Sequence, residues 1–246
     1  MKLSVIVPML NEAAVLPDLL GHLLPMQRAG CEVLLVDGGS TDGSAQMARV
    51  AGFSVIDSAA GRARQMNAGA RQARGEVLLF LHADSRLPDG AERLVSRALS
   101  ASVGHIAPVW GRFDVRISGQ SPWLKVVARM MNLRSRLSGI ATGDQAIFVR
   151  RTVFQACGGF PEQPLMEDIE LCKRLKRRSP PACLADQVIT LNALNPQIAA
   201  RQLTPLTRWR KFDAARQALM RGELERIRDS GTLSSDVYEV VSKSLA

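Results

Sequence analysis

The chain has 246 residues, a formal net charge of +9 and a hydrophobic content of 46%. This length and apolar content exclude a disordered chain and are enough for one large α/β domain or two smaller ones. Aromatic residues make up only 4% of the chain, and the basic residues are scattered except at Lys173 to Arg178, so we expect no nucleic-acid partner.

Cysteine spacing and apolar runs indicate the compartment. The four cysteines lie far apart without CxxC spacing, which predicts neither a zinc site nor a disulfide framework. The first apolar run is broken by Pro8, Asn11 and Glu12, as is typical of a first strand rather than a signal peptide. No run approaches the roughly 20 apolar residues of a membrane span. We expect a cytoplasmic protein, or one bound peripherally at the inner membrane.

Strand and helix patterns alternate through the first hundred residues. Continuous apolar runs predict strands buried on both faces, at residues 2–10, 31–39, 53–58 and 76–85. Helical spacing predicts the helices between them, at residues 11–27, 41–52 and 61–75. This order is typical of a Rossmann-like, mostly parallel sheet with right-handed crossovers and flanking helices.

The pattern changes after a predicted helix at residues 91–102. Alternation over residues 109–118 predicts an antiparallel or edge strand. Residues 121–139 predict a helix with a basic and an apolar face, which is either an ordinary surface helix or a contact with a membrane or lipid-linked acceptor. The remaining predictions are a strand at residues 143–151 and helices at residues 152–160 and 166–178.

Residues 192–246 have the pattern of a short all-helical tail on the α/β body. Asn195 and Pro196 mark the start of one helix, at its N-cap and first helical position. A second helix has Asp213 as its N-cap and Gly231 beyond its end, and residues 234–246 predict a third.

Polar motifs follow the predicted strands where each one ends. They are "PMLNE", "DGGSTDG" and "HADS", and a fourth motif, "MED", begins a later helix. Strands of a parallel sheet end at one edge, where ligands bind, and the glycines after Asp37 allow close backbone approach. Acids at this edge suit a nucleoside diphosphate held by Mg²⁺ or Mn²⁺, with Asp84 as a metal ligand.

These segments resemble family 2 glycosyltransferases of the GT-A fold, and within them the transferases associated with radical-SAM and selenodomain proteins. The likeness is carried by "VIVPMLNEA", "VDGGSTDGS", "GRARQMNAGA", "LLFLHADSRLP", "MNLRSRLSGIATGDQAIFVRR" and "GGFPEQPLMEDIELCKRLKR". It implies metal-assisted, inverting transfer of a sugar from a nucleotide-diphosphate donor. The acceptor would be lipid-linked or a small molecule.

The resemblance also implies roles for single residues. Asp168 matches the general base of inverting relatives, with Glu167 as the fallback. Asp84 matches the second acid of the metal motif, whereas His82 stands where many relatives carry the first acid, which weakens the metal prediction. The implied nucleotide-sugar contacts are Pro8, Asn11, Glu12, Asp37, Gly38, Gly39, Arg62, Asn67, Gly69, His82, Ala83 and Asp84. The implied acceptor or sugar pocket consists of Gly143, Asp144 and Gln145.

The sequence beyond Leu184 resembles instead the C-terminal end of M1-family aminopeptidases of the aminopeptidase N type. The zinc motif HExxH is absent, so no peptidase chemistry is inferred. The chain is therefore expected to be chimeric, with a transferase-like domain at residues 1–185 and a helical tail at residues 186–246. The tail is expected to dock loosely through an apolar stripe, which consists of Leu219, Ile227, Val237 and Val240.

Two other functions are weighed against the transferase. A nucleotide-sugar binding module with little or no turnover is the main alternative, because the native C-terminal region is replaced. A nucleotidyltransferase would need a basic triphosphate loop after the first strand, and "PMLNEAA" contains no Lys or Arg.

Overall fold

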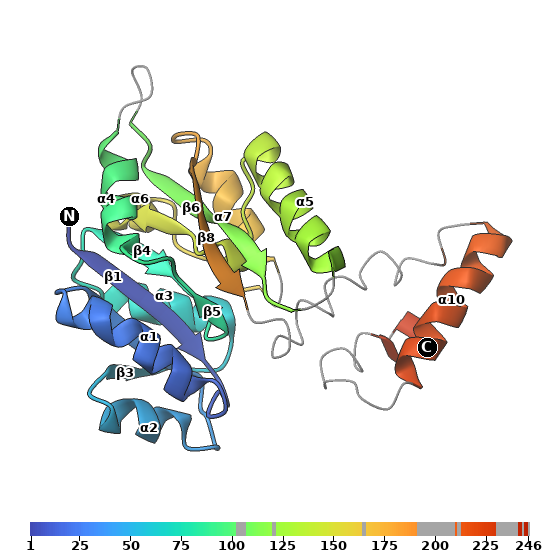
Figure 1. The fold of residues 1–246 in the computed structure, drawn as a ribbon, viewed down its shortest axis with the longest axis horizontal. Helices are drawn as coiled ribbons and strands as arrows, with labels where there is room; N and C mark the ends of the chain where they lie inside the picture. Colours follow the sequence, from blue (N-terminus) through green and yellow to red (C-terminus); the bar gives the residue numbers. More distant parts are fainter. Residues whose placement is uncertain are drawn as a thin grey trace. The chain divides into compact units, whose positions relative to one another are not determined.

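The computed structural model describes residues 1–101, 107–119, 122–163, 166–190, 210, 213–229, 241–242 and 244–245. The chain forms two compact units, Met1–Thr190 and Leu191–Ala246. Figure 1 shows the first unit as a sheet flanked by helices.

Four parallel strands form one half of the sheet. They are β1 (Leu3–Met9), β2 (Glu32–Asp37), β3 (Ser54–Asp57) and β4 (Val77–Phe80), in the order β3-β2-β1-β4. The helices that connect them are α1 (Leu16–Arg28), α2 (Ser44–Val50) and α3 (Arg62–Gln72). The predicted β-α-β order is confirmed, and the carboxyl ends of β2, β1 and β4 lie at neighbouring positions.

The other half of the sheet is mixed. It continues from β4 through β7 (Phe148–Arg150), β6 (Trp110–Ile117) and β8 (Ala182–Thr190) to β5 (Ser85–Arg86). β6 is antiparallel to β7 and parallel to β8. The antiparallel expectation for this strand is confirmed on one side, but the edge alternative is wrong because both sides of β6 are paired.

β8 has no counterpart among the predicted elements. Leu184 pairs with Phe113 and Gln187 pairs with Asp114, so residues 185 and 186 form a bulge between them. Residues 185–187 are exposed, which conceals the alternation that would indicate a strand. The predicted domain boundary at residues 185 and 186 falls at this bulge, while the first compact unit continues to Thr190.

Five further helical segments lie in the described part of the first unit. They are α4 (Ala91–Ser100), α5 (Pro122–Ser138), the 3₁₀ helix η1 (Gly143–Gln145), α6 (Arg151–Ala156) and α7 (Glu167–Leu175). The predicted strand at 143–151 is wrong over its first half. The chain forms η1 there, and Ala146 then adopts a left-handed conformation at φ 44° before the strand begins.

The sheet separates two apolar layers. Val5 and Val7 of β1 pack in the layer that includes α1 and α4 side chains. Ile6, between them, points into the layer that includes residues of α3, α6 and α7. Successive residues of a strand face opposite sides of a sheet, so the continuous apolar character of β1 is explained by burial on both faces.

The second unit contains α10 (Ala214–Arg228), which lies within the predicted helix at residues 213–231. The helix predicted from Asn195 and most of the helix predicted at 234–246 lie outside the described residues. Leu219 is 75% exposed, and the side chains of the other three stripe residues are not described.

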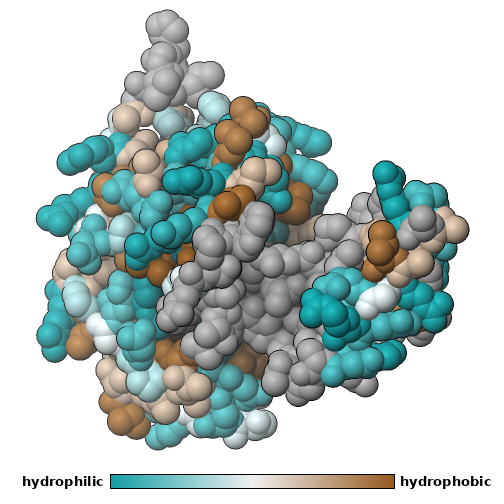
Figure 2. Space-filling view, turned by 45° about the vertical axis from the view of Figure 1, so that its right-hand side comes forward, coloured by the Kyte–Doolittle hydropathy of each residue, from teal (hydrophilic) through white to brown (hydrophobic). Residues whose placement is uncertain are grey.

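The described surface mixes hydrophobic and hydrophilic residues (Figure 2). Among the residues that the structure describes, no helix has both the length and the hydropathy of a membrane span.

Candidate active site

Hydrogen bonds join the loops that follow β1 and β2 at the edge of the sheet. The Asn11 backbone N–H donates to Ser40 Oγ at 2.9 Å, and the Thr41 N–H donates to Asn11 Oδ1 at 2.8 Å. Asn11 takes a left-handed conformation, at φ 55°, which asparagine tolerates better than most residues. The Ala13 N–H donates to Asp42 Oδ2 at 2.9 Å. The two sequence motifs therefore form one structural unit.

Asp37 ends β2 and presents one unpaired oxygen. Its Oδ2 accepts hydrogen bonds from the backbone N–H groups of Gly39 and Ser40, both at 3.0 Å. Its Oδ1 is buried and has no hydrogen-bond partner in the described structure. Gly39 has φ 93°, so the tight turn after Asp37 requires glycine.

Gln65 of α3 supports this turn and was missed by the sequence analysis. Its Nε2 donates to the carbonyls of Met9 and Val36, both at 2.8 Å, and joins the ends of β1 and β2. A Cβ on Gly38 would lie 3.0 Å from the same atom. The sequence offers one signal for this role, because Gln65 is a polar residue next to Met66 on the buried face of α3.

Carboxylates from three loops converge beside Arg62. The pKa of Glu12 is raised to about 7, chiefly by burial and then by the charges of Asp84 and Asp42, while the charge of Arg62 lowers it. Asp84 is only 7% exposed, and its Oδ1 accepts a hydrogen bond from Ser85 Oγ at 3.1 Å. The ends of β1, β2 and β4 and the start of α3 are thus brought together, as the motifs predicted.

A second group of residues connects the "HADS" motif with α7. His82 Nδ1 lies 3.4 Å from Asp144 Oδ1, and both side chains are buried. The Gly143 backbone N–H donates to Asp168 Oδ2 at 2.8 Å. A Cβ on Gly143 would overlap the imidazole of His82, so only glycine fits. η1 therefore lies between the predicted base and the predicted metal motif.

Other predicted residues have structural contacts. Arg62 Nη1 lies 3.7 Å from Glu167 Oε1. Asn67 Nδ2 donates to the Phe160 carbonyl at 2.8 Å, and the Phe160 N–H donates to Asn67 Oδ1 at 3.0 Å. A Cβ on Gly69 would lie 2.5 Å from a side-chain carbon of Ile6. These contacts account for Asn67 and Gly69 by packing, and their nucleotide contacts stay predictions.

The remaining predicted residues border the same edge. Pro8 pairs with Val36 across the β1–β2 ladder. Ala83 is 5% exposed beside Asp84. Gln145 is fully buried, and its Nε2 lies 3.3 Å from Asn132 Oδ1 of α5. Gln145 therefore shapes the site through its neighbours.

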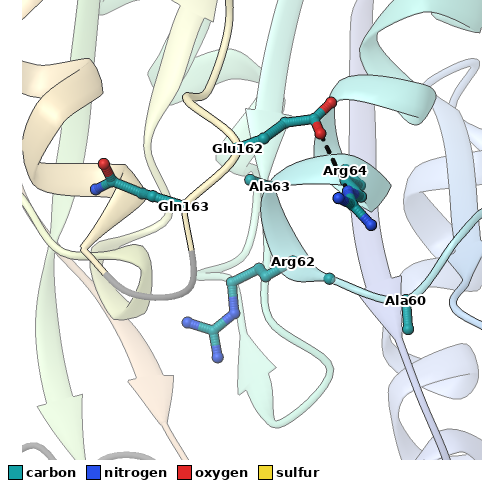
Figure 3. A pocket seen from close by; sticks show the side chains of 7 residues that line it. Ala60, Arg62, Ala63, Arg64, Glu162 and Gln163 are labelled. Carbon is teal, nitrogen blue, oxygen red and sulfur yellow. Dashed lines mark hydrogen bonds and ion pairs between the residues drawn. The ribbon is translucent and has the colours of Figure 1, made fainter.

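A pocket of about 230 Å³ opens at the start of α3 (Figure 3). It is lined by Ala60, Gly61, Arg62, Ala63, Arg64, Glu162 and Gln163. Arg64 Nε and Glu162 Oε2, 3.1 Å apart, form one side, while the Arg62 guanidinium points away from this pair (Figure 3). The charge of Arg62 also lowers the pKa of Glu12, so the pocket adjoins the group of carboxylates.

Comparison with known proteins identifies the family. Residues 4–156, more than half of the chain, match the model for glycosyl transferase family 2. The chain belongs to this family. The solved structure of the mannosyltransferase PcManGT of Pyrobaculum calidifontis, in complex with GDP-Man and Mn²⁺, superposes on this family 2 chain with a TM-score of 0.62 at 18% identity. The match covers 99% of this chain and 69% of that one and confirms the GT-A, Rossmann-like fold.

Two curated relatives match different parts of this family 2 chain. Undecaprenyl-phosphate 4-deoxy-4-formamido-L-arabinose transferase of Pseudomonas paraeruginosa is 33% identical over 162 residues, or 60% of this chain. Aminopeptidase N of Haemophilus influenzae is 48% identical over 62 residues, or 25% of this chain. The chain spans 45% of the transferase and 7% of the aminopeptidase.

The second match confirms the aminopeptidase-like C-terminal segment. Residues 182–246 also match the model described as "Domain of unknown function (DUF3458_C) ARM repeats". This match includes all of β8, so an inner strand of the transferase sheet lies in the aminopeptidase-like sequence.

Proposed function

We propose that this chain transfers a sugar from a nucleoside diphosphate donor to an acceptor hydroxyl, with inversion at the anomeric carbon and with the help of a divalent cation. The observation that carries this proposal is the unpaired Oδ1 of Asp37. A buried polar atom without a partner costs about 1–3 kcal/mol, which a donor from the ligand would recover. A ribose hydroxyl or a base N–H provides such a donor at the end of a parallel strand.

The residues at the edge fit a divalent cation. Asp84 and Glu12 offer carboxylate oxygens, the ligand type that Mg²⁺ and Mn²⁺ prefer, and their mutual repulsion is part of the raised pKa of Glu12. Among the described residues no three His, Cys, Asp or Glu side chains form a closed metal site, so the diphosphate would supply the remaining ligands. The bound cation would neutralise charge on the departing diphosphate.

Asp168 is the base in this proposal. Its Oδ2 is held by the Gly143 N–H and its Oδ1 by the Ile169 N–H, which fixes the carboxylate at the start of α7. The acceptor oxygen would attack the anomeric carbon while its proton passes to this carboxylate. A positioned base contributes roughly 10²- to 10⁴-fold in rate. Glu167 is less suited to this role because Arg62 lies beside it.

The acceptor that we propose is lipid-linked. The transferase relative is named for undecaprenyl phosphate, and it matches 60% of this chain. Membership of the subfamily associated with radical-SAM proteins is part of the same proposal, as is the division at residues 185 and 186.

Calorimetric titration of UDP and GDP in the presence of Mn²⁺ tests donor binding, and a donor-hydrolysis assay tests turnover. Asp84→Asn should abolish Mn²⁺-dependent nucleotide binding, whereas Asp168→Asn should preserve binding and lower turnover at least 100-fold, the lower end expected for a lost base. Asp57→Asn is the matched control, because its carboxylate is 78% exposed on β3.

Each variant has a contrary result. Unchanged Mn²⁺-dependent binding by Asp84→Asn would place the metal elsewhere. Tight donor binding by the wild-type chain without any turnover would favour the binding module over the transferase.

A further inference from the structure

α5 exposes a row of large apolar side chains. Val126 is 45% exposed, Met130 63%, Leu133 53% and Leu137 80%. Spacings of four, three and four residues place them on one side of the helix. Hydrophobic residues surrounded by hydrophilic ones are visible on the described surface in Figure 2. Isolated exposed leucines are ordinary, but a row of four along one helix points to a partner.

Cations border this row on both sides. At 100° per residue, Lys125 and Arg129 lie on one flank of the row and Arg134 lies on the other. All three are exposed, and none forms an ion pair with another described residue. The helix contains no acidic residue. An apolar stripe between cations is the pattern of a helix that lies in the interface of an anionic membrane.

The apolar row cannot turn toward the protein, because the opposite side of α5 is fixed to β6. Asn132 Oδ1 accepts from the Val115 N–H at 2.9 Å, and Asn132 Nδ2 donates to the Val115 carbonyl at 3.0 Å. Arg136, on the same flank as Lys125 and Arg129, pairs through Nη2 with Asp114 Oδ2 of β6 at 2.6 Å. Ala128 is buried and packs beside Val115.

We propose that this face of α5 docks on an anionic lipid surface, with the apolar row in the headgroup region and Lys125, Arg129 and Arg134 beside lipid phosphates. Charge complementarity favours this occupant, because the chain carries a net charge of +9 and each cation near an anionic leaflet adds to binding. A second copy of the same face would place cations against cations. A nucleic acid would leave the apolar row without a partner.

Docking through α5 would bring the active site near the membrane. Asn132 Oδ1, on the inner side of α5, lies 3.3 Å from Gln145 Nε2 of η1. The first residue of η1, Gly143, donates its backbone N–H to Asp168. If the proposed transfer is correct, a lipid-linked acceptor would reach the site from the same surface. The docking itself does not depend on that reaction.

Vesicle flotation of the full chain tests the docking. The probes are phosphatidylcholine vesicles and vesicles with about one third phosphatidylglycerol, each at about 0.05 M and about 0.5 M NaCl. We expect binding to the anionic vesicles at low salt, with weaker binding at high salt. The Met130→Glu/Leu133→Glu variant should bind at least tenfold more weakly, and Lys125→Gln about fivefold more weakly.

Val50→Glu is the matched control, since Val50 is 78% exposed on α2 and should bind vesicles like the wild type. Equal binding to both kinds of vesicle, or wild-type binding by the double variant, would overturn the proposal. So would sedimentation showing that the double variant only dissociates a dimer. Nucleotide titration without vesicles keeps the two proposals separate, because the double variant should bind donor normally.

Discussion

Replacing Glu12 with glutamine should remove a pH dependence of stability that originates in the candidate active site. Burial, with help from Asp84 and Asp42, raises the pKa of Glu12 from 4.5 to about 7. A carboxyl group with a higher pKa in the folded chain than in the unfolded chain stabilises the fold below pH 4.5. That stability is lost as the pH rises through 7. The loss is at most about 3 kcal/mol, and solvent screening reduces it to about 1–3 kcal/mol.

Urea unfolding of the full chain measures this loss. Trp110 is completely buried in the first unit, so tryptophan fluorescence of a Trp209→Phe background reports on the unfolding of that unit. Between about pH 5 and about pH 8, with EDTA present, the wild type should lose about 1–3 kcal/mol more stability than Glu12→Gln. Asp57→Asn removes an exposed carboxylate and should keep the wild-type profile. Parallel profiles for the wild type and Glu12→Gln would refute the assignment of the pH-dependent loss of stability to Glu12.

Mn²⁺ gives the same experiment a second readout. A cation between Glu12 and Asp84 would neutralise their repulsion, so Mn²⁺ at ten times its dissociation constant should stabilise the wild type by about 1.4 kcal/mol near pH 8. Asp84→Asn should lose this gain. Equal stabilisation of both proteins by Mn²⁺ would show that the cation binds away from Asp84.

Three further predictions concern packing and reactivity. Gly69→Ala should lower the stability measured in urea by about 1–3 kcal/mol, since the new Cβ would lie 2.5 Å from a side-chain carbon of Ile6. Gly21→Ala is its control and should be neutral or stabilising, because no atom lies within 4 Å of that Cβ. Gln65→Ala should cost about 1–3 kcal/mol in the same assay, because the Met9 and Val36 carbonyls lose the hydrogen bonds from Gln65 Nε2, although the Met9 carbonyl keeps the one from the Gly38 N–H. Cys172 should resist a thiol reagent at about pH 8 until the chain unfolds, because burial raises its pKa to about 12. Labelling of Cys172 in the native chain would contradict that.

The parallel half of the fold could be predicted from the sequence because each strand buries both faces. Val5, Ile6 and Val7 therefore form an unbroken apolar run, which marks β1 whatever surrounds it. β8 could not be predicted, since residues 185–187 are exposed at a bulge. The start of β7 was misplaced because the left-handed Ala146 that separates η1 from the strand leaves no mark on the apolar pattern.

The candidate site also contains some residues that could be predicted from the sequence and others that could not. Glu12, Asp37 and Asp84 could be predicted because acids at strand ends share one edge of the sheet. Gln65 was missed because its partners are backbone carbonyls of β1 and β2, which the sequence of α3 does not specify. Asn67 differs from Gln65, because it was predicted to contact the nucleotide sugar. Its side chain forms hydrogen bonds with the backbone of Phe160 instead of facing the open edge of the sheet.

β8 explains how an aminopeptidase-like segment can complete a transferase sheet. Ladder hydrogen bonds come from the backbone, so the strand needs only suitable burial at alternate positions. Val188 and Thr190 are fully buried, and Thr190 Oγ1 lies 3.4 Å from Ser85 Oγ, next to Asp84. Without this strand, β6 would be an open edge and β5 would lose its partner. Residues of the C-terminal family match therefore pack behind the "HADS" motif, and the sheet of the first unit includes them as far as Thr190.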